Sequence, residues 1–149
     1  MKRGMTVALI LAVCAFATHS GAEKKAERRY ILLNPDSKLP FSNGVLVGDT
    51  LYVAGSIGLD PKTGRPPAEL EEEARLALDG VRNTLVKAGM TMDDLVAVEV
   101  YCSDVANYAK FNDVYRTYFQ HEFPARAFLG SGPLLFGARF EVKGMAVKR

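Results

Sequence analysis

An amphipathic helical segment between Pro66 and Gly89 limits what this chain can fold into, because its apolar stripe must be covered. Proline is tolerated in a first helical turn, so Pro66 and Pro67 mark where the helix begins, and Gly89 marks its end. Carboxylates near the beginning of a helix interact favourably with the helix dipole. Four of them lie there: Glu69, Glu71, Glu72 and Glu73. Apolar residues recur at helical spacing, at Leu70, Ala74, Leu78, Val81 and Leu85.

β-Prone runs surround this helix and would form the sheet that covers it. Residues 44–47 and 50–54 flank Gly48-Asp49, and this pattern predicts a hairpin with a two-residue turn. Residues 95–102 predict a buried, valine-rich strand in which Glu99 is the one charge. Near the C-terminus, residues 127–129 and 140–147 predict a pair of strands separated by a glycine-rich connection.

A second helix is expected between the third strand and this pair. Asn107 is a suitable cap for it, and the helix should run to about Gln120, before Phe123-Pro124 ends it. Its aromatic face is interpreted as core packing, through Phe111, Tyr115, Tyr118 and Phe119. The order β-β-α-β-α-β-β predicts an α+β domain with two helices packed on one sheet.

The first 22 residues differ from the rest in charge and hydropathy. The chain of 149 residues has a formal charge of +2, and Lys2 and Arg3 alone account for this surplus. Residues 6–17 form an apolar run that is too short for a bilayer, which takes about 20 residues. With the small residues Ser20 to Ala22, this pattern predicts a signal peptide at residues 1–22. An uncleaved anchor, a misannotated start and a lipoprotein site at Cys14 are the alternatives.

Processing after Ala22 would leave a neutral chain, exported to the periplasm or secreted, with no stable membrane anchor. We expect residues 23–33 to be flexible and residues 34–149 to form one domain. Neutral charge gives no electrostatic reason to expect a nucleic-acid partner. The processed chain would keep one histidine, His121, and one cysteine, Cys102, too few for a structural zinc site, and no phosphate-loop or dinucleotide glycine pattern indicates a cofactor. Cys102 is interpreted as a packed thiol and His121 as a solvated side chain.

Two charges lie inside apolar strands, Arg126 and Glu141. A charge in such a strand must face solvent or find a partner. Across a hairpin the two would share a face if the connection has an even number of residues, and lie on opposite faces if the number is odd. They could form a structural salt bridge. Alternatively, Arg126 could bind a carboxylate through two hydrogen bonds while Glu141 orients a water.

Several motifs are shared with a known family and together cover residues 34–148. They are Pro40-Phe41-Ser42-Asn43, the run from Val47 to Gly64, Phe111-Asn112-Asp113-Val114-Tyr115, Phe123-Pro124-Ala125-Arg126 and Gly137-Ala138-Arg139-Phe140-Glu141-Val142. In these motifs the chain resembles the RidA/YjgF family of imine and enamine deaminases. The resemblance implies a chorismate-mutase-like fold with two helices on one mixed sheet, and a homotrimer with a ligand site in each inter-subunit cleft.

The resemblance also implies a reaction: hydrolysis of a 2-imino acid or its enamine tautomer to a 2-keto acid and ammonia, without cofactor or metal. Arg126 would bind the substrate carboxylate and Glu141 would position the attacking water. Asn112, Gly55 and Phe41 correspond to further residues near the cleft.

The chain departs from the family pattern at several of these positions. Phe41 replaces a frequent tyrosine, Ala54-Gly55-Ser56 replaces Ser-Gly-Gln, and Lys143 replaces a frequent acid. The first two departures remove polar groups, so a trimeric module that binds small carboxylates without turnover is the alternative function. A ribonuclease or chaperone role has no motif of its own in this chain.

Overall fold

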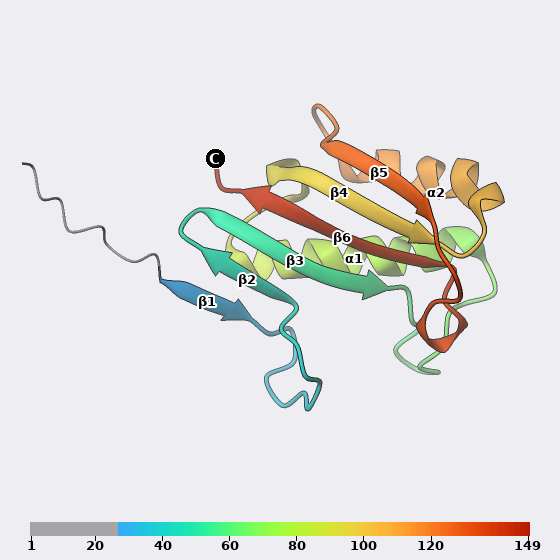
Figure 1. Cartoon of the computed structure of the whole chain (residues 1–149), viewed down its shortest axis with the longest axis horizontal. Coiled ribbons are helices and arrows are strands. Elements are labelled where there is room, and N and C mark those ends of the chain that lie inside the picture. The colour runs from blue at the N-terminus through green and yellow to red at the C-terminus, as the bar shows by residue number, and fades with distance from the viewer. Residues whose placement is uncertain (1–26) are drawn as a thin grey trace, which may run out of the picture.

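Six strands form one sheet in the computed structural model, which describes residues 27–149 (Figure 1). They are β1 (Arg28–Ile31), β2 (Gly44–Val47), β3 (Thr50–Ile57), β4 (Leu95–Cys102), β5 (Ala125–Gly130) and β6 (Phe140–Val147). Their order across the sheet is β1-β2-β3-β6-β4-β5. The β4–β5 pair is parallel and every other neighbouring pair is antiparallel, so the sheet is mixed, as expected.

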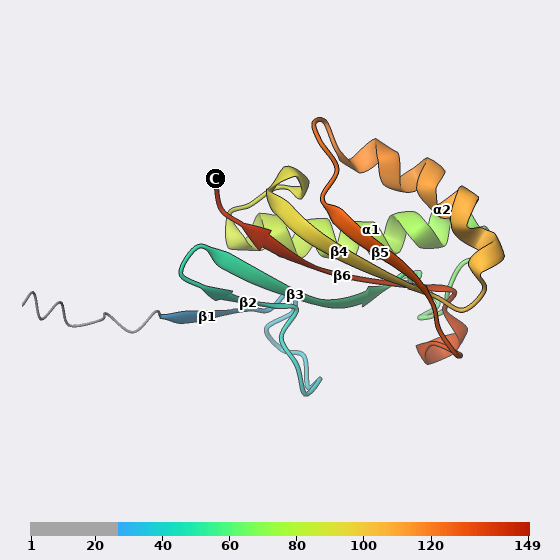
Figure 2. The ribbon, with the colours of Figure 1, turned by 45° about the horizontal axis from the view of Figure 1, so that its top comes forward.

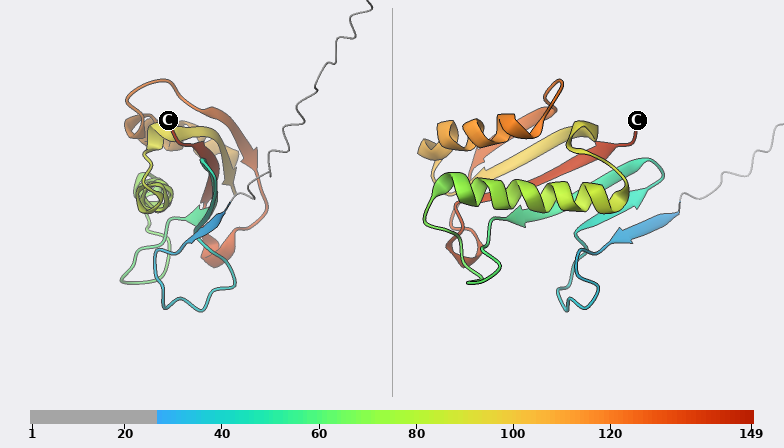
Figure 3. Two further views of the ribbon diagram at one scale, coloured as in Figure 1. Left: turned by 90° about the vertical axis from the view of Figure 1, so that its left-hand side faces the viewer. Right: turned by 180° about the vertical axis from the view of Figure 1, so that it is seen from behind.

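Two helices, α1 (Leu70–Ala88) and α2 (Tyr108–Tyr115), cover one face of this sheet, and the opposite face is left open (Figures 2 and 3). Short 3₁₀ turns occur at η1 (Met92–Asp94), η2 (Val105–Asn107), η3 (Arg116–Tyr118) and η4 (Leu135–Gly137). The predicted α+β class and the two-helix layer are therefore confirmed. Within residues 27–149, no helix combines the length and apolar character needed to cross a membrane.

The predicted apolar stripe of α1 forms the centre of the core. Ala74, Leu78 and Leu85 are fully buried, and they belong to the same cluster as buried strand residues such as Leu51 and Phe140. Burial of each leucine contributes about 1.5–3 kcal/mol relative to an exposed side chain. Gly89 ends the helix with φ +83°, the left-handed conformation that the sequence predicted there. The helix begins at Leu70, four residues later than Pro66.

The predicted hairpin is present, with Gly48 in its turn at φ +58°. Two strands differ from expectation. β3 continues to Ile57 through an irregularity between Val53 and Ser56. β1 lies within residues 23–33, where we expected a flexible segment. It pairs with β2, and two contacts anchor it to the rest of the fold: Ile31 is buried, and Arg29 Nη2 donates to the carbonyl of Ala88 in α1 at 2.8 Å.

The second helix is shorter than predicted, and its cap is different. Helical hydrogen bonding continues only to Tyr115, after which the chain tightens into η3. Asn107 makes no capping hydrogen bond through its side chain. Asp104 caps η2 instead, accepting from Ala106 N at 3.0 Å, so Asn107 already lies inside the helical run. The interpretation of the aromatic face as core is confirmed, since Phe111 and Tyr115 are buried.

A buried ion pair joins the beginning of α1 to the segment before β6. Glu73 is fully buried, and its carboxylate accepts from the backbone and Nε of Arg139 and from Phe140 N. Arg139 also donates to the carbonyls of Pro67 and Ala68. Among the four glutamates at this end of the helix, Glu73 is therefore a structural anchor.

Candidate functional site

Arg126 lies near the beginning of the edge strand β5, on the face of the sheet that carries the helices. Its partner on β4 is Val98, which is 3% exposed and packs into the core. Arg126 is itself half-buried, and its Nη2 donates to Asn112 Oδ1 on α2 at 2.7 Å. Two of the predicted site residues are thus in direct contact, and the contact ties β5 to α2.

Three aromatic rings surround the guanidinium of Arg126. Its Cζ lies 4.4 Å from the ring centroid of Tyr115, 5.8 Å from that of Tyr108 and 5.9 Å from that of Phe128. Contacts within about 6 Å of a ring stabilise a cation electrostatically. The rings therefore hold the guanidinium in place without neutralising its charge.

Part of the hydrogen-bonding capacity of this cation is unused. Nη1 of Arg126 and the hydroxyl of Tyr115 are buried and have no partner among the described residues 27–149. The residues Arg126 and Tyr115 also line a cavity of about 180 Å³, together with Tyr108, Asn112, Arg116, Phe123 and Pro124. Because a buried donor without a partner is costly, and because no acid among residues 27–149 lines this cavity, the arrangement favours an anionic ligand beside the Arg126 guanidinium.

The two tyrosines of the cavity titrate differently. Burial raises the pKa of Tyr115 to about 12, although the nearby Arg126 opposes the shift. A hydrogen bond with Asn112 lowers the pKa of Tyr108, and the positive charge of Arg126 lowers it further. Tyr115 is therefore protonated at neutral pH, with its buried hydroxyl group on the ring that lies against Arg126.

Glu141 lies on the opposite, open face of the sheet. Its neighbours along β6, Phe140 and Val142, are buried under the helices, so the alternation of the strand turns Glu141 the other way. Gly55 on β3 lies against it. A Cβ atom at Gly55 would be 1.9 Å from Glu141 Oε1, so only glycine fits the present carboxylate position. Gly55 and Glu141 form a second pair of predicted site residues.

The structure corrects the expectation of a hairpin between the strands that carry Arg126 and Glu141. β5 and β6 are not neighbours, because β4 lies between them. Arg126 is in register with Val98, which faces Gly144, three residues along β6 from Glu141. The two positions are about 10 Å apart along the strands and about 10 Å across them. Neither residue forms an ion pair within residues 27–149, so the structural salt bridge is wrong.

Comparison with known proteins assigns the chain to a family. The family described as endoribonuclease L-PSP matches residues 32–148. A bovine 2-iminobutanoate/2-iminopropanoate deaminase is 38% identical over 110 residues, which cover 73% of this chain and 80% of that protein. The human protein of that name is 34% identical with the same coverage. The chain belongs to the RidA/YjgF family.

Solved structures agree with this assignment. The YjgF gene product of Escherichia coli has a TM-score of 0.75 and 30% identity, covering 81% of this chain and 99% of that chain. The structure of E. coli TdcF with bound serine has a TM-score of 0.74 and 28% identity, covering 81% of this chain and 100% of that chain. The two-helix layer on a mixed sheet is thus the RidA/YjgF fold.

Two further positions belong to the resemblance to the family, Phe41 and Ser56. Phe41 lies in the loop that hydrogen-bonds to β3, and Ser56 follows Gly55 on β3. Phe41 is 53% exposed in the loop before β2, and the backbone of that loop joins β3 where Ala54 N donates to the carbonyl of Asn43. Ser56 is directed toward α1, since a Cβ at Gly80 would be 2.1 Å from its hydroxyl. Ser56 therefore faces the helix layer, whereas Glu141 faces the open side of this RidA/YjgF sheet.

A charged cluster on the open face was not predicted. Tyr101 donates to Glu99 Oε2 at 2.5 Å, and Lys143 Nζ is 3.4 Å from the same oxygen. The hydrogen bond from Tyr101 lowers the pKa of Glu99, and Lys143 adds to the shift. Lys143, which departs from the RidA/YjgF pattern, thus pairs with the lone charge of β4. The cluster could have been found from the opposite charges of Glu99 and Lys143, but only if the register between β4 and β6 were known.

The interpretation of Cys102 as a packed thiol is confirmed. It is fully buried, its Sγ donates to the carbonyl of Asp104, and burial raises its pKa. His121 is exposed. Within residues 27–149, no three side chains among His, Cys, Asp and Glu are grouped as metal ligands would be.

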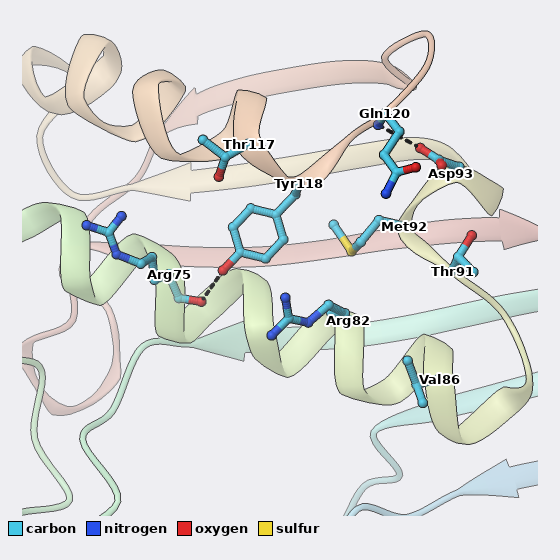
Figure 4. Close-up of a pocket in the computed structure, with 9 residues that line it drawn as sticks. All are labelled: Arg75, Arg82, Val86, Thr91, Met92, Asp93, Thr117, Tyr118 and Gln120. Atoms are coloured by element: carbon cyan, nitrogen blue, oxygen red, sulfur yellow. Dashed lines mark hydrogen bonds between the residues drawn. The ribbon is translucent and has the colours of Figure 1, made fainter.

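A separate groove of about 460 Å³ lies between α1 and η3 in this RidA/YjgF chain (Figure 4). It contains two arginines, but both are paired: Arg75 with Glu72 at 3.6 Å and Arg82 with Asp79 at 2.9 Å. Tyr118 also donates to Asp79, at 2.6 Å. The charges of this groove are therefore balanced internally, in contrast to the cavity around Arg126.

Proposed function

We propose that this protein hydrolyses 2-imino acids, or their enamine tautomers, to 2-keto acids and ammonia. The observation that carries the proposal is the half-buried Arg126: within residues 27–149 its Nη1 has no partner, and the cavity that Arg126 lines has no acidic residue. Two kinds of relative support it. The bovine and human proteins are named imine deaminases, and the E. coli TdcF structure is described with bound serine, a small molecule with a carboxylate.

We further propose that the working site forms between subunits of a homotrimer. Arg126 and Glu141 lie on opposite faces of one sheet, so one chain does not bring them together. The β5 edge of one subunit, placed against the open face of the next, would join the two halves. The open face carries exposed apolar side chains suited to such a contact, including Tyr52, Leu129 and Met145.

In this site Arg126 binds the substrate carboxylate. A guanidinium can offer two parallel N–H groups to a carboxylate, and the free Nη1 would be one of them. Asn112 keeps Nη2 fixed, while Tyr115 contributes a protonated hydroxyl beside it. These contacts would orient the imine carbon toward the neighbouring subunit.

Glu141 of the neighbouring subunit positions the water. Its carboxylate accepts a hydrogen bond from water, whose oxygen attacks the imine carbon as a proton passes to the imine nitrogen. In the resulting carbinolamine the C–N bond breaks as the hydroxyl proton passes to the amino nitrogen, and the products are the 2-keto acid and ammonia. Imines hydrolyse spontaneously in water, so positioning of substrate and water is sufficient to accelerate the reaction.

An imine-hydrolysis assay tests the proposal. An amino-acid oxidase generates 2-iminopropanoate in situ, and the purified protein should accelerate its disappearance. Arg126→Ala should abolish that acceleration, while Arg65→Ala, at an exposed arginine in the turn before α1, should preserve it. No acceleration by a correctly folded trimer would rule out the deaminase function.

The second candidate is a binding module without turnover. It is favoured by Phe41, which lacks the hydroxyl that many family members carry at this position. Calorimetry would support it if 2-keto acids bind in an Arg126-dependent manner while the imine assay shows no catalysis.

We also propose that the protein is exported. The proposal rests on the signal-peptide pattern of residues 1–22, which lie outside the described residues. Cell fractionation with N-terminal sequencing tests it: a periplasmic or secreted form beginning at Glu23 is expected, and a cytoplasmic form retaining Met1 would contradict it.

A further inference from the structure

Among residues 27–149, those that line the cavity around Arg126 include a second arginine, Arg116, and no acidic residue. Arg116 follows the last residue of α2 and begins η3, where its side chain is exposed at the cavity. It forms no ion pair or side-chain hydrogen bond with any residue in 27–149. The cavity thus has two positive charges that the described chain leaves unbalanced.

The helical run that includes α2 places Arg116 one turn beyond Asn112, the residue that holds Arg126. Tyr108, Asn112 and Arg116 are four residues apart, so they follow one another along one side of the helical run. Asn112 holds Arg126, and Arg116 begins about 6 Å further along the axis. The positive charge of Arg116 also contributes to the lowered pKa of Tyr108, which lies at the same cavity.

The arginines of α1 differ from Arg116 because each of them has an acidic partner. Arg75 and Arg82 line the neighbouring groove, but each is paired with an acid on its own helix. Arg116 has no such acid: the residue three positions earlier is Asp113, which does not pair with it and does not line the cavity. A ligand with two negative groups would balance both charges of the cavity.

We infer that the site prefers 2-imino acids with a second carboxylate, the imines of four- and five-carbon acidic amino acids. Arg126 binds the carboxylate next to the imine, and Arg116 binds the distal one. This inference rests on the proposed function, since it uses the same cavity and the same carboxylate contact. Because Arg116 is exposed, its contribution should weaken as salt concentration rises.

Calorimetry with two keto acids of different charge tests the inference on the purified full chain. We expect the Kd of 2-oxoglutarate to be about tenfold lower than that of 2-oxobutanoate, the effect of one charge-assisted hydrogen bond. Arg116→Gln should reduce this ratio to about one, and Arg116→Lys should retain part of it. Arg65→Gln, a matched loss of an exposed arginine away from the cavity, should leave the ratio unchanged.

Turnover provides a second readout, with 2-iminoglutarate and 2-iminobutanoate generated by oxidases. The ratio of their kcat/KM values should fall about tenfold in Arg116→Gln. Equal binding of the two keto acids, or a preference that survives Arg116→Gln, would overturn the inference, and continued hydrolysis of 2-iminobutanoate would leave the proposed function intact. Failure of both keto acids to bind and of both imines to react would overturn both.

Discussion

Asn112 Oδ1 accepts a hydrogen bond of 2.7 Å from Arg126 Nη2, and this contact joins α2 to the edge strand β5. Asn112 is buried, so its amide fixes one nitrogen of the guanidinium inside the protein. An amide oxygen binds the cation without cancelling its charge. The guanidinium therefore keeps its positive charge, and its Nη1 has no hydrogen-bond partner within residues 27–149.

Replacement of Asn112 by aspartate should weaken substrate binding without destabilising the fold. A carboxylate at the position of Oδ1 would form an ion pair with Arg126 and compete with the substrate carboxylate. We expect the KM for 2-iminobutanoate to rise about tenfold or more while the Tm is retained. Steady-state kinetics and thermal unfolding measure the two effects, and an unchanged KM would show that Arg126 does not bind the substrate.

Gly55→Ala should impair catalysis with little change in stability. The new Cβ would displace Glu141 Oε1, which is the movable end of a flexible side chain. Displacement of a positioning group by about 1 Å can lower a rate about 100-fold, so we expect mainly kcat to fall. Gly132→Ala is the matched control, because nothing lies within 4 Å of a Cβ there. Equal kcat values for the two variants would argue against a role of Glu141 in positioning the water.

Glu73→Ala should strongly destabilise the fold. Removing this carboxylate leaves the Arg139 guanidinium and two backbone N–H groups without their acceptor. Breaking a buried ion pair in this way costs about 3–5 kcal/mol. Glu72→Ala is the control, since its exposed pair with Arg75 should contribute less than about 1 kcal/mol. Urea unfolding measures both, and similar midpoints would contradict the anchoring role of Glu73.

Titration of Tyr108 should report the charge of Arg126. That charge favours the tyrosinate, so its removal in Arg126→Ala should raise the pKa of Tyr108 toward the ordinary value of 10. Ultraviolet absorbance of tyrosinate, as the difference between each protein and its Tyr108→Phe counterpart, isolates this group. If the pKa of Tyr108 is the same with and without Arg126, the guanidinium does not lie close to the Tyr108 hydroxyl.

Local patterns predicted most of the fold. The stripe from Leu70 to Leu85, the turn at Gly48 and the stop at Gly89 each depend on neighbouring residues, and each is present. β1 escaped prediction because Arg28 and Arg29 lie next to a charged stretch, and only pairing with β2 makes this segment a strand. The extent of α2 was overestimated because aromatic spacing does not distinguish an α-helix from the tighter turn that follows it.

Candidate site residues could be named from the sequence, but their arrangement in space could not be predicted. Arg126 and Glu141 stood out as charges in apolar strands, yet sequential strands suggested a hairpin. The parallel β4–β5 pair, with β4 inserted beside β6, is a long-range feature that no local pattern encodes. The contacts of Arg126 with Asn112 and of Glu141 with Gly55 likewise depend on how distant elements pack.

Complementation between two inactive variants tests the inter-subunit site most directly. Arg126→Ala retains Glu141, and Glu141→Gln retains Arg126, so a mixed trimer can contain intact sites if each residue serves a different subunit boundary. After the two variants are unfolded and refolded together in equal amounts, random assembly should restore about a quarter of the wild-type deaminase activity. No activity in trimers that demonstrably contain both variants would contradict a site built from Arg126 of one subunit and Glu141 of the next.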